Sequence, residues 1–335
     1  MSTAVTRITA AAIAAGLALT LAACGGDQTP SGGTTSDGGG EPTGAATEGG
    51  GSLTGTVAAD GSSTVAPLTS AAATAFRDVE PGVNVTVATS GTGGGFKVFC
   101  AGETDISDAS RPIKDEEAQA CADAGVEFTE IVIANDGLSV VVNPANDWAQ
   151  CLTVEQLNTM WAPEAEGTIT SWNQIDPSFP DVPLDLYGAG TDSGTFDYFT
   201  GEINGEEGAT RADYTPSEDD NVTVQGVAGS EGGVGYFGLS YYEENSDVLK
   251  LVDIDGGEGC VTPSRETVQD GTYTPLGRPL FIYVNNAKYS DNPAVQAFID
   301  FYLENEATIA EEALVIDLTD EQATTARTEL DSLKG

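Results

Sequence analysis

The chain has 335 residues, with 53 aspartates and glutamates, 12 lysines and arginines, no histidine and a formal net charge of -41. The length allows two domains of ordinary size, and a hydrophobic content of 40% supports packed cores. The acid excess argues against nucleic acid as a partner, because phosphate backbones are bound by basic surfaces. Without histidine, the chain cannot form a Ser-His-Asp or Cys-His catalytic arrangement, and it lacks the commonest zinc ligand.

The first residues have the pattern of a bacterial lipoprotein leader. Arg7 gives a weakly positive start, and residues 8–23 form an apolar run that is too short for a spanning helix. The run ends in Leu-Ala-Ala-Cys, which is similar to the lipobox, where the cysteine is lipidated and becomes the mature N-terminus. We therefore predict a signal peptide at residues 1–23 and lipid attachment at Cys24. An ordinary signal peptide with a chance cysteine is the alternative.

Residues 24–52 are rich in glycine, serine and threonine and contain almost no apolar side chains. Such a segment buries too little surface to order itself, so we expect a flexible tether. The folded body is expected to begin near Leu53 and to lie outside the cytoplasm, anchored to the cell membrane through the lipid.

The body alternates between strand and helix patterns. Strands are predicted at residues 53–58, 83–89, 105–109, 126–134, 138–143, 184–188 and 279–285. Helices are predicted at residues 64–76, 96–101 and 114–124, from a capping box at 153–156, at 196–200, and near the C-terminus around 295–303. Residues 232–237 are interpreted as a glycine-rich bend. The alternation predicts an α/β protein with largely parallel sheets.

Four cysteines remain in the body, Cys100, Cys121, Cys151 and Cys260. An even number in an exported chain indicates two disulfides. Three pairings are possible. We favour Cys100 with Cys121, which closes a short local loop and leaves Cys151 with Cys260. A metal site is the alternative, but the chain has no C-x-x-C pair, and we expect no metal.

Three polar loops between predicted strands and helices combine glycine with small hydroxyl side chains, at residues 60–67, 90–96 and 192–196. The N–H groups at a helix start lack internal partners, and that end of the helix is partly positive. An anion there is stabilised without a charged side chain, while glycine allows close approach and hydroxyls add donors. One such loop is usually only a turn and a helix cap. Three of them predict a shared site for a small oxyanion.

A fourth segment, residues 104–113, brings an acid and an arginine close together in the sequence. A carboxylate such as Asp108 is unfavourable beside an anion unless the ligand carries a proton that the carboxylate can accept. Hydrogen phosphate carries one and sulfate at neutral pH does not, so Asp108 predicts selectivity. Arg111 would pair with the ligand or hold the aspartate in place. A plain surface pair of Asp108 and Arg111 is the alternative.

Together these motifs resemble a known family. The stretches DGSSTVAPLT, SGTGGGFKVFCAGETDISDASRPI, YGAGTDSGTFDYFT and SEDDNVTVQGVAGSEGGVGYFG are similar to the phosphate-binding subunit of bacterial high-affinity phosphate ABC transporters. The resemblance runs from about Gly55 to the final helix. It implies a type II periplasmic-binding-protein fold, in which two hinge strands join two α/β lobes and the ligand lies in the cleft between them. The implied parts are lobe I at 53–137 plus 279–335, lobe II at 138–278, and hinge strands near 131–142 and 279–284.

The resemblance also implies a set of phosphate-binding residues. They are Ser63, Thr64 and the N–H of Val65 in the first loop, Ser90 and Thr92 in the second, Asp108 as acceptor of the ligand proton, and Ser193, Gly194 and Thr195 in the third. Many relatives carry an arginine four residues before this serine, where this chain has Ala189. Arg111 is the implied substitute.

The implied function is that of a lipid-anchored solute-binding protein that captures inorganic phosphate and delivers it to the permease subunits and ATPase of an ABC transporter. We expect a monomer without a cofactor and without enzymatic activity. Ser193 has neither a histidine nor a lysine at S-x-x-K spacing to activate it, which argues against a hydrolase. The alternatives are binding of sulfate, molybdate or tungstate, a phosphatase that shares the cradle, and an adhesion or signalling protein that has lost transport.

Overall fold

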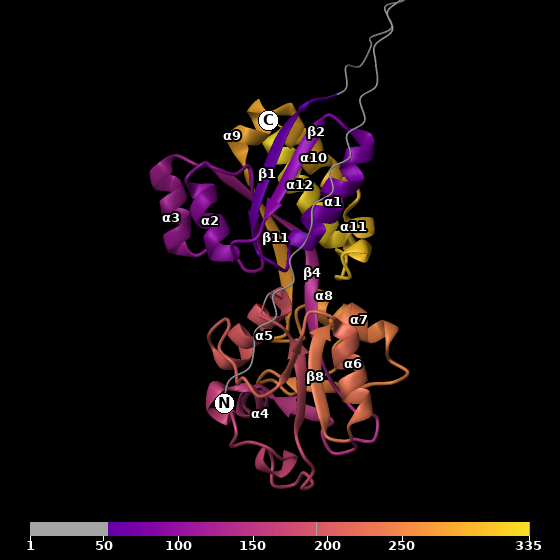
Figure 1. Ribbon diagram of the computed structural model, residues 1–335. Coiled ribbons are helices and arrows are strands. Elements are labelled where there is room, and N and C mark those ends of the chain that lie inside the picture. Colours follow the sequence, from indigo (N-terminus) through magenta and orange to yellow (C-terminus); the bar gives the residue numbers. More distant parts are fainter. Residues whose placement is uncertain (1–52, 192, 335) are drawn as a thin grey trace, which may run out of the picture. The chain divides into compact units, whose positions relative to one another are not determined.

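The computed structural model describes residues 53–191 and 193–334 (Figure 1). The predicted signal peptide, the lipid-attachment residue Cys24 and the tether lie outside these residues. Within the described part of the chain, no helix combines the length and the apolar character needed to cross a membrane.

A first group of strands is built around parallel pairs. Strand β1 (Gly55–Gly61) lies parallel to β2 (Val83–Ala88) and to β3 (Ile106–Ala109). Strand β11 (Gly277–Asn285) is antiparallel to β3 and to the long strand β4 (Phe128–Val142). Because β11 runs against β1 and β3, its first residues lie at the edge of the sheet where those two strands end.

A second group of strands is reached through β4, which continues past β11. Strand β4 is antiparallel to β8 (Gly233–Gly238) and to β9 (Lys250–Asp255). Strand β6 (Asp185–Ala189) lies parallel to β8 and to β7 (Thr215–Ser217). The short strands β5 and β10 pair with β9. Figure 1 shows β4 and β11 side by side between the two groups.

The remaining elements connect these strands. The two short strands are β5 (Cys151–Thr153) and β10 (Cys260–Val261). The helices are α1 (Ala66–Val79), α2 (Thr92–Cys100), α3 (Asp115–Ala124), α4 (Val154–Trp161), α5 (Gly194–Asn204), α6 (Asp220–Gly229), α7 (Leu239–Glu244), α8 (Arg265–Gln269), α9 (Asn286–Asp291), α10 (Pro293–Glu304), α11 (Glu306–Glu312) and α12 (Asp320–Leu333). Both favoured disulfides, Cys100–Cys121 and Cys151–Cys260, are present, which confirms that pairing.

Two large hydrophobic cores follow the two groups of strands. The first includes Phe76 and Phe298, and the second includes Trp161 and Tyr236. The segment after α11 joins both, because Ile316 packs in the second core and Leu318 in the first. Ile316 also bonds to Asn135 of β4 through two backbone hydrogen bonds, with N···O distances of 2.7 and 2.9 Å.

The two strands predicted at residues 126–134 and 138–143 form one continuous strand. The polar residues between them, Asn135, Asp136 and Gly137, pair with the start of β11 and therefore stay extended. The sequence suggested a break at this point, but pairing with a distant segment removes it.

The interpretation of residues 232–237 as a bend is wrong, because Gly233–Gly238 forms strand β8. Its glycines allow helix α6 to pack closely on the strand. A Cβ at Gly235 would lie 2.7 Å from Thr223 Cγ2, and a Cβ at Gly233 would lie 2.9 Å from Val227 Cα. Glycine marks close approach here, not a change of direction.

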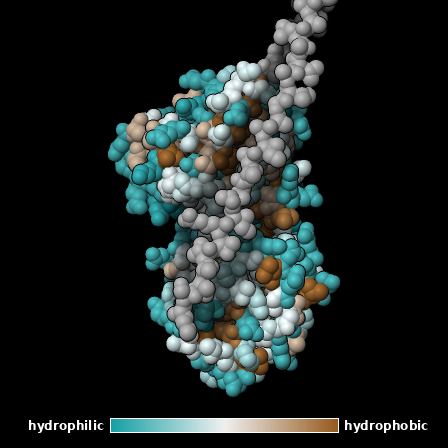
Figure 2. Space-filling view, viewed as in Figure 1, coloured by the Kyte–Doolittle hydropathy of each residue, from teal (hydrophilic) through white to brown (hydrophobic). Residues whose placement is uncertain are grey.

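The surface is mostly polar, in agreement with the many acidic residues of the chain. Hydrophilic residues cover most of the visible described surface in Figure 2. In the described ranges, the exposed large hydrophobic side chains are Val79, Val222, Val248 and Leu314.

Candidate functional site

The three polar loops all follow strands that run in parallel. They connect β1 to α1, β2 to α2 and β6 to α5, and Ser110 follows the end of β3. In α/β sheets, ligands bind in the crevice outside the carboxyl ends of such strands. The connectivity therefore predicts that groups from all three loops, with the start of β11, lie near one another.

A small cavity of about 20 Å³ lies where these segments meet. It is lined by Ser62, Ser63, Thr64, Gly91, Thr92 and Ser110 from the first group of elements, by Gly194, Asp197, Tyr198 and Glu207 from the second, and by Arg278 of β11. Pockets for drug-sized ligands are far larger, roughly 300–1,000 Å³. The volume of this cavity is therefore far below that of a pocket for a metabolite-sized ligand.

Gly194 brings the first turn of α5 directly against the first loop. A Cβ at this position would lie 2.4 Å from Thr64 Oγ1, 2.6 Å from Thr64 N and 2.9 Å from Ser63 Oγ. Every other residue would force these atoms apart, so glycine is required for the approach. The contact connects a helix of the second core with a loop that leads into the first.

The backbone of the first loop is largely engaged within its own turn. The N–H of Thr64 donates to Ser62 Oγ at 3.2 Å, and the N–H of Val65 donates to Ser62 O at 3.2 Å. The hydroxyls of Ser63 and Thr64, more than the predicted Val65 N–H, are therefore the groups that this loop presents to the cavity.

The second loop contributes Thr92 to the cavity, whereas Ser90 lies outside it. Thr92 Oγ1 accepts a hydrogen bond from the N–H of Ser110 at 3.2 Å and lies 3.1 Å from the Ser110 hydroxyl. Ser90 is exposed, and its N–H donates to Asp60 Oδ1 at 3.0 Å. Thr92 and Ser110 therefore form a pair of hydroxyls at the ends of β2 and β3.

The third loop is divided between the cavity and a neighbouring groove. Ser193 caps α5 by accepting a hydrogen bond from Thr195 N at 3.2 Å. Ser193 and Thr195 line the groove of about 350 Å³, which shares Ser63, Thr64 and Gly194 with the cavity. The short connection from Ala189 at the end of β6 to Gly194 at the start of α5 thus brings this loop to the same place as the first.

Arg278 is the cation of the cavity. Its Nη2 donates to Thr64 Oγ1 at 3.1 Å, and its Nη1 donates to Ser110 O at 3.1 Å. Nε and Nη2 donate to Asp136 Oδ2 at 3.4 and 3.3 Å. The guanidinium also lies over the ring of Tyr198, with Cζ 3.4 Å from the ring centroid.

The sequence reasoning missed Arg278, although a signal was available. The arginine stands directly before the predicted strand at 279–285. An antiparallel strand in that place starts where its parallel neighbours end, which brings Arg278 to the ends of β1 and β3.

Arg111, the arginine chosen from the sequence, lies away from the cavity lining. Its Nη1 and Nη2 donate to Glu117 Oε2 and Oε1, each at 2.8 Å. The guanidinium lies 5.7 Å from the centroid of the Phe96 ring. This two-pronged pair with α3 already uses the edge of Arg111 that would otherwise face a ligand.

Asp108 is buried behind the first loop and lies outside the cavity lining. Its Oδ1 accepts a hydrogen bond from Thr69 Oγ1 at 2.9 Å, and its backbone carbonyl accepts one from Ser62 N at 2.9 Å. Oδ2 has no hydrogen-bond partner among the described residues. Burial raises the pKa of Asp108 to about 7, and the charge of Asp60 adds to the effect. Asp108 therefore supports the loop that carries Ser63 and Thr64.

Two other carboxylates line the cavity, those of Asp197 and Glu207. Burial and the nearby charge of Glu207 raise the pKa of Asp197, while Arg278 and a hydrogen bond from Ser63 oppose the rise. Asp197 is partly buried and Glu207 is exposed. A ligand in the cavity would therefore meet acid groups as well as donors.

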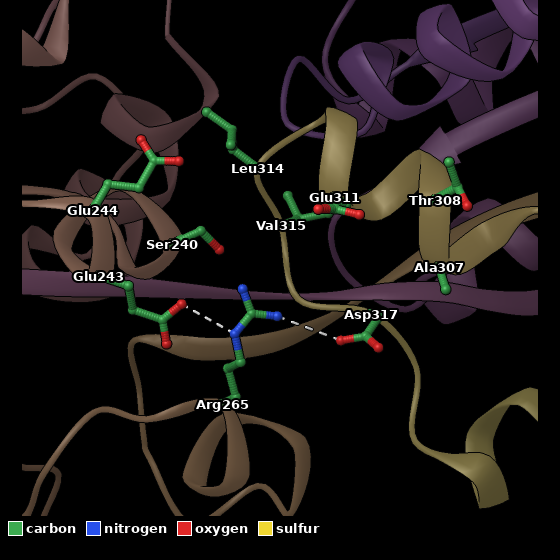
Figure 3. A pocket seen from close by; sticks show the side chains of 10 residues that line it. All are labelled: Ser240, Glu243, Glu244, Arg265, Ala307, Thr308, Glu311, Leu314, Val315 and Asp317. Atoms are coloured by element: carbon green, nitrogen blue, oxygen red, sulfur yellow. Dashed lines mark hydrogen bonds and ion pairs between the residues drawn. The ribbon is translucent and has the colours of Figure 1, made fainter.

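A larger groove, of about 530 Å³, lies beside α7, α8 and α11 (Figure 3). Its cation, Arg265, is paired with Glu243 at 3.0 Å and with Asp317 at 3.5 Å. Glu244 and Glu311 also line it. With four acids around one arginine, this groove is poorly suited to an anion. Over the part of the chain that the structure describes, no cluster of three metal-ligating side chains occurs.

Comparison with known proteins identifies clear relatives. The model of the PBP superfamily domain matches residues 46–306. Protein SphX of a Synechocystis species is 52% identical over 78% of this chain and 77% of its own length. The phosphate-binding protein PstS of Staphylococcus saprophyticus is 39% identical over 96% of this chain and 93% of its own length. The crystal structure of a possible phosphate-binding protein from Planctomyces limnophilus superimposes with a TM-score of 0.81 at 46% identity, covering 85% of this chain and 100% of that one.

Replacing Asp108 with asparagine should flatten the dependence of stability on pH. In the wild type, the pKa of about 7 lies above the ordinary value of 3.8, so the folded state holds the proton more tightly than the unfolded state. The free energy of unfolding should therefore fall by up to a few kcal/mol as the pH rises from about 4 through 7. Asparagine cannot ionise but retains an oxygen for Thr69. Urea unfolding between pH 5 and 8 measures the effect, and identical pH curves for both proteins would contradict it.

Proposed function

Because the chain belongs to the PBP superfamily and, within it, to the family that includes PstS and SphX, we propose that it captures inorganic phosphate outside the cytoplasm and delivers it to the permease and ATPase of an ABC transporter. This family consists of binding proteins and not of enzymes. The observation that supports the ligand most directly is the cavity that gathers Arg278 and hydroxyls from separate loops.

Local donors allow an acidic chain to hold an anion. Charges separated by more than about 8 Å of water are largely screened at physiological salt, so the groups that touch the ligand set its affinity. We propose that Arg278 supplies the charge and that Ser63, Thr64, Thr92 and Ser110 supply hydroxyl donors. The contacts of Arg278 with Asp136, Thr64 and Ser110 use four of its five N–H groups, so one N–H of Nη1 remains for a ligand oxygen, beside the fixed positive charge.

We propose that Asp197, in place of Asp108, accepts the proton of the ligand. A carboxylate beside an anion repels it unless the two share a hydrogen, and hydrogen phosphate supplies one where sulfate does not. Asp197 lines the cavity and interacts with Ser63, whereas Asp108 bonds to Thr69 behind the loop. The residue that distinguishes phosphate from sulfate is therefore on α5.

Capture also requires that the site can open. We propose that residues 53–137 plus 279–335 form one lobe and residues 138–278 the other, with β4 and β11 as the hinge between them. Two hydrophobic cores and the passage of β4 from one group of strands to the other support this division. Closure would then place Gly194 against Thr64 and enclose the ligand.

Replacing Arg278 with glutamine should weaken phosphate binding roughly 10- to 100-fold, since charge-assisted hydrogen bonds are lost. Arg111→Gln is the matched control, because that guanidinium is paired with Glu117, and it should change the affinity less than twofold. Titration calorimetry with phosphate measures both.

Wild-type protein freed of phosphate has to bind phosphate in the same titrations, and sulfate, molybdate and tungstate have to compete poorly. Absence of binding would reject the proposed function. Equal competition by a fully ionised oxyanion would reject phosphate as the specific ligand. A larger loss of phosphate affinity in Arg111→Gln than in Arg278→Gln would show that Arg111 is the arginine that binds the ligand.

Asp197→Asn should reduce the preference for phosphate over sulfate about tenfold, because the amide offers a donor that sulfate can use and no longer accepts the ligand proton. Competition titrations at pH 7 give the ratio of the two affinities. Asp108→Asn is the comparison variant, and a change of preference in that protein alone would assign the proton acceptor to Asp108.

We also propose that Cys24 carries a lipid that holds the protein on the outer face of the cell membrane. Cys24→Ser should release the protein into the soluble extracellular fraction, because a leader without its cysteine leaves no attachment site. Metabolic labelling with palmitate and fractionation measure the change. Unaltered labelling and membrane association in Cys24→Ser would refute the anchor.

A further inference from the structure

The guanidinium of Arg278 is held in one plane by contacts on two of its edges. Asp136 accepts from Nε and Nη2, and Ser110 O accepts from Nη1. The side chain of Asp136 is only 8% exposed and that of Arg278 16%, so water competes little for these contacts. These hydrogen bonds fix the edges of the guanidinium group. They leave its two flat faces without a contact.

Tyr198 covers one of those faces. Cζ of Arg278 lies 3.4 Å from the centroid of the Tyr198 ring, well inside the roughly 6 Å range of cation–π contacts. The ring itself is fixed at its far end, where the hydroxyl donates to Pro275 O at 2.7 Å. A buried ring held from both the helix and the hydroxyl forms a rigid platform for the arginine.

This platform belongs to a different part of the molecule from the other partners of Arg278. Tyr198 lies on α5, and the residue after it, Phe199, packs in the second core. Thr64 and Ser110, which contact Nη2 and Nη1, follow β1 and β3 of the first group of strands. Arg278 is thus supported on its edges by one group of elements and on its face by the other.

Nearby carboxylates make this support necessary. Asp197 and Glu207 line the same cavity, and the charge of Arg278 acts on both Asp197 and Glu202. A guanidinium free to swing could pair with one of these acids and turn its donors away from the cavity. The ring of Tyr198 occupies one side of the plane and so restricts that rotation.

We propose that Tyr198 is a positioning residue that fixes the plane of the Arg278 guanidinium toward the bound anion. The orientation of the guanidinium therefore depends on helix α5 lying against the start of β11. The inference rests on the proposed function for the identity of the anion. Tyr198 would affect ligand binding by orienting Arg278 and would not itself bond to the ligand.

The test compares three single variants of the full chain by titration calorimetry with inorganic phosphate. Tyr198→Leu should weaken binding roughly 5- to 30-fold, because the cation–π contact is lost. Tyr198→Phe keeps the ring and should recover most of the affinity. Phe199→Leu removes a buried ring from the same helix, on the side that stacks on Tyr236, and should lower thermal stability without this loss of affinity. Equal losses in Tyr198→Leu and Phe199→Leu would overturn the proposal.

A double-mutant cycle shows whether the effect passes through Arg278. In an Arg278→Gln background, which has no cation to lie over the ring, Tyr198→Leu should cost less than a further twofold. Additive losses would overturn the proposal. If Tyr198→Leu does not fold, pentafluorophenylalanine at position 198 serves instead, since it keeps the shape of phenylalanine and reverses the charge distribution of the ring face. Affinity equal to that of Tyr198→Phe would then overturn it.

Failure of the proposed function would be recognised separately. If the wild type binds no phosphate, the ligand assignment is rejected, and the same cycle is then measured by urea unfolding. Coupling between positions 198 and 278 would still support the energetic contact between the ring and the guanidinium, and additive changes in unfolding free energy would refute it.

Discussion

The candidate site depends on the placement of one positive charge in a chain whose formal net charge is -41. Arg278 can serve as an anion-binding group only if the surrounding carboxylates do not use all of its donors. Asp136 takes one edge of the guanidinium, Thr64 and Ser110 take further donors, and Tyr198 covers a face. Each contact limits the directions in which the arginine can turn, so the structure around it favours one orientation toward the cavity.

The fold explains how these partners meet. The carboxyl ends of β1, β2 and β3 lie along one edge of a sheet, and β11 enters that edge from the opposite direction with Arg278 at its start. The absence of a side chain at Gly194 lets α5 approach Thr64 within ordinary contact distance. Strand direction and one glycine therefore bring together residues that are more than 200 positions apart in the chain, as in the contact of Arg278 with Thr64.

Much of this arrangement could be predicted from local patterns. Alternating apolar residues indicated β2, and glycine with small hydroxyls indicated the loops that contain Thr64, Thr92 and Gly194. These signals are readable because they reflect the chemistry of neighbouring residues. The number and spacing of the cysteines also led to the observed pairing.

The features that could not be read from the sequence depend on contacts between separate helices and strands. Arg278 is placed by the antiparallel register of β11 with β4, and Arg111 is turned away by Glu117 on α3. Asp108 faces inward because Thr69 of α1 donates a hydrogen bond to its Oδ1. Gly235 is part of a strand because it pairs with Val141 of β4 and Tyr187 of β6. In each case, a contact with another helix or strand, which the local pattern does not show, decides the placement of the residue.

The position of Ile316 also has a consequence for how the molecule is assembled during synthesis. Nearly all of the second core comes from residues 138–276, yet Ile316 fills part of it and bonds to Asn135 in the middle of the chain. Leu318, Ala326 and Leu330 belong to the first core. A polypeptide that lacks these last residues has both interiors unfinished, so the two halves become complete together and not one after the other.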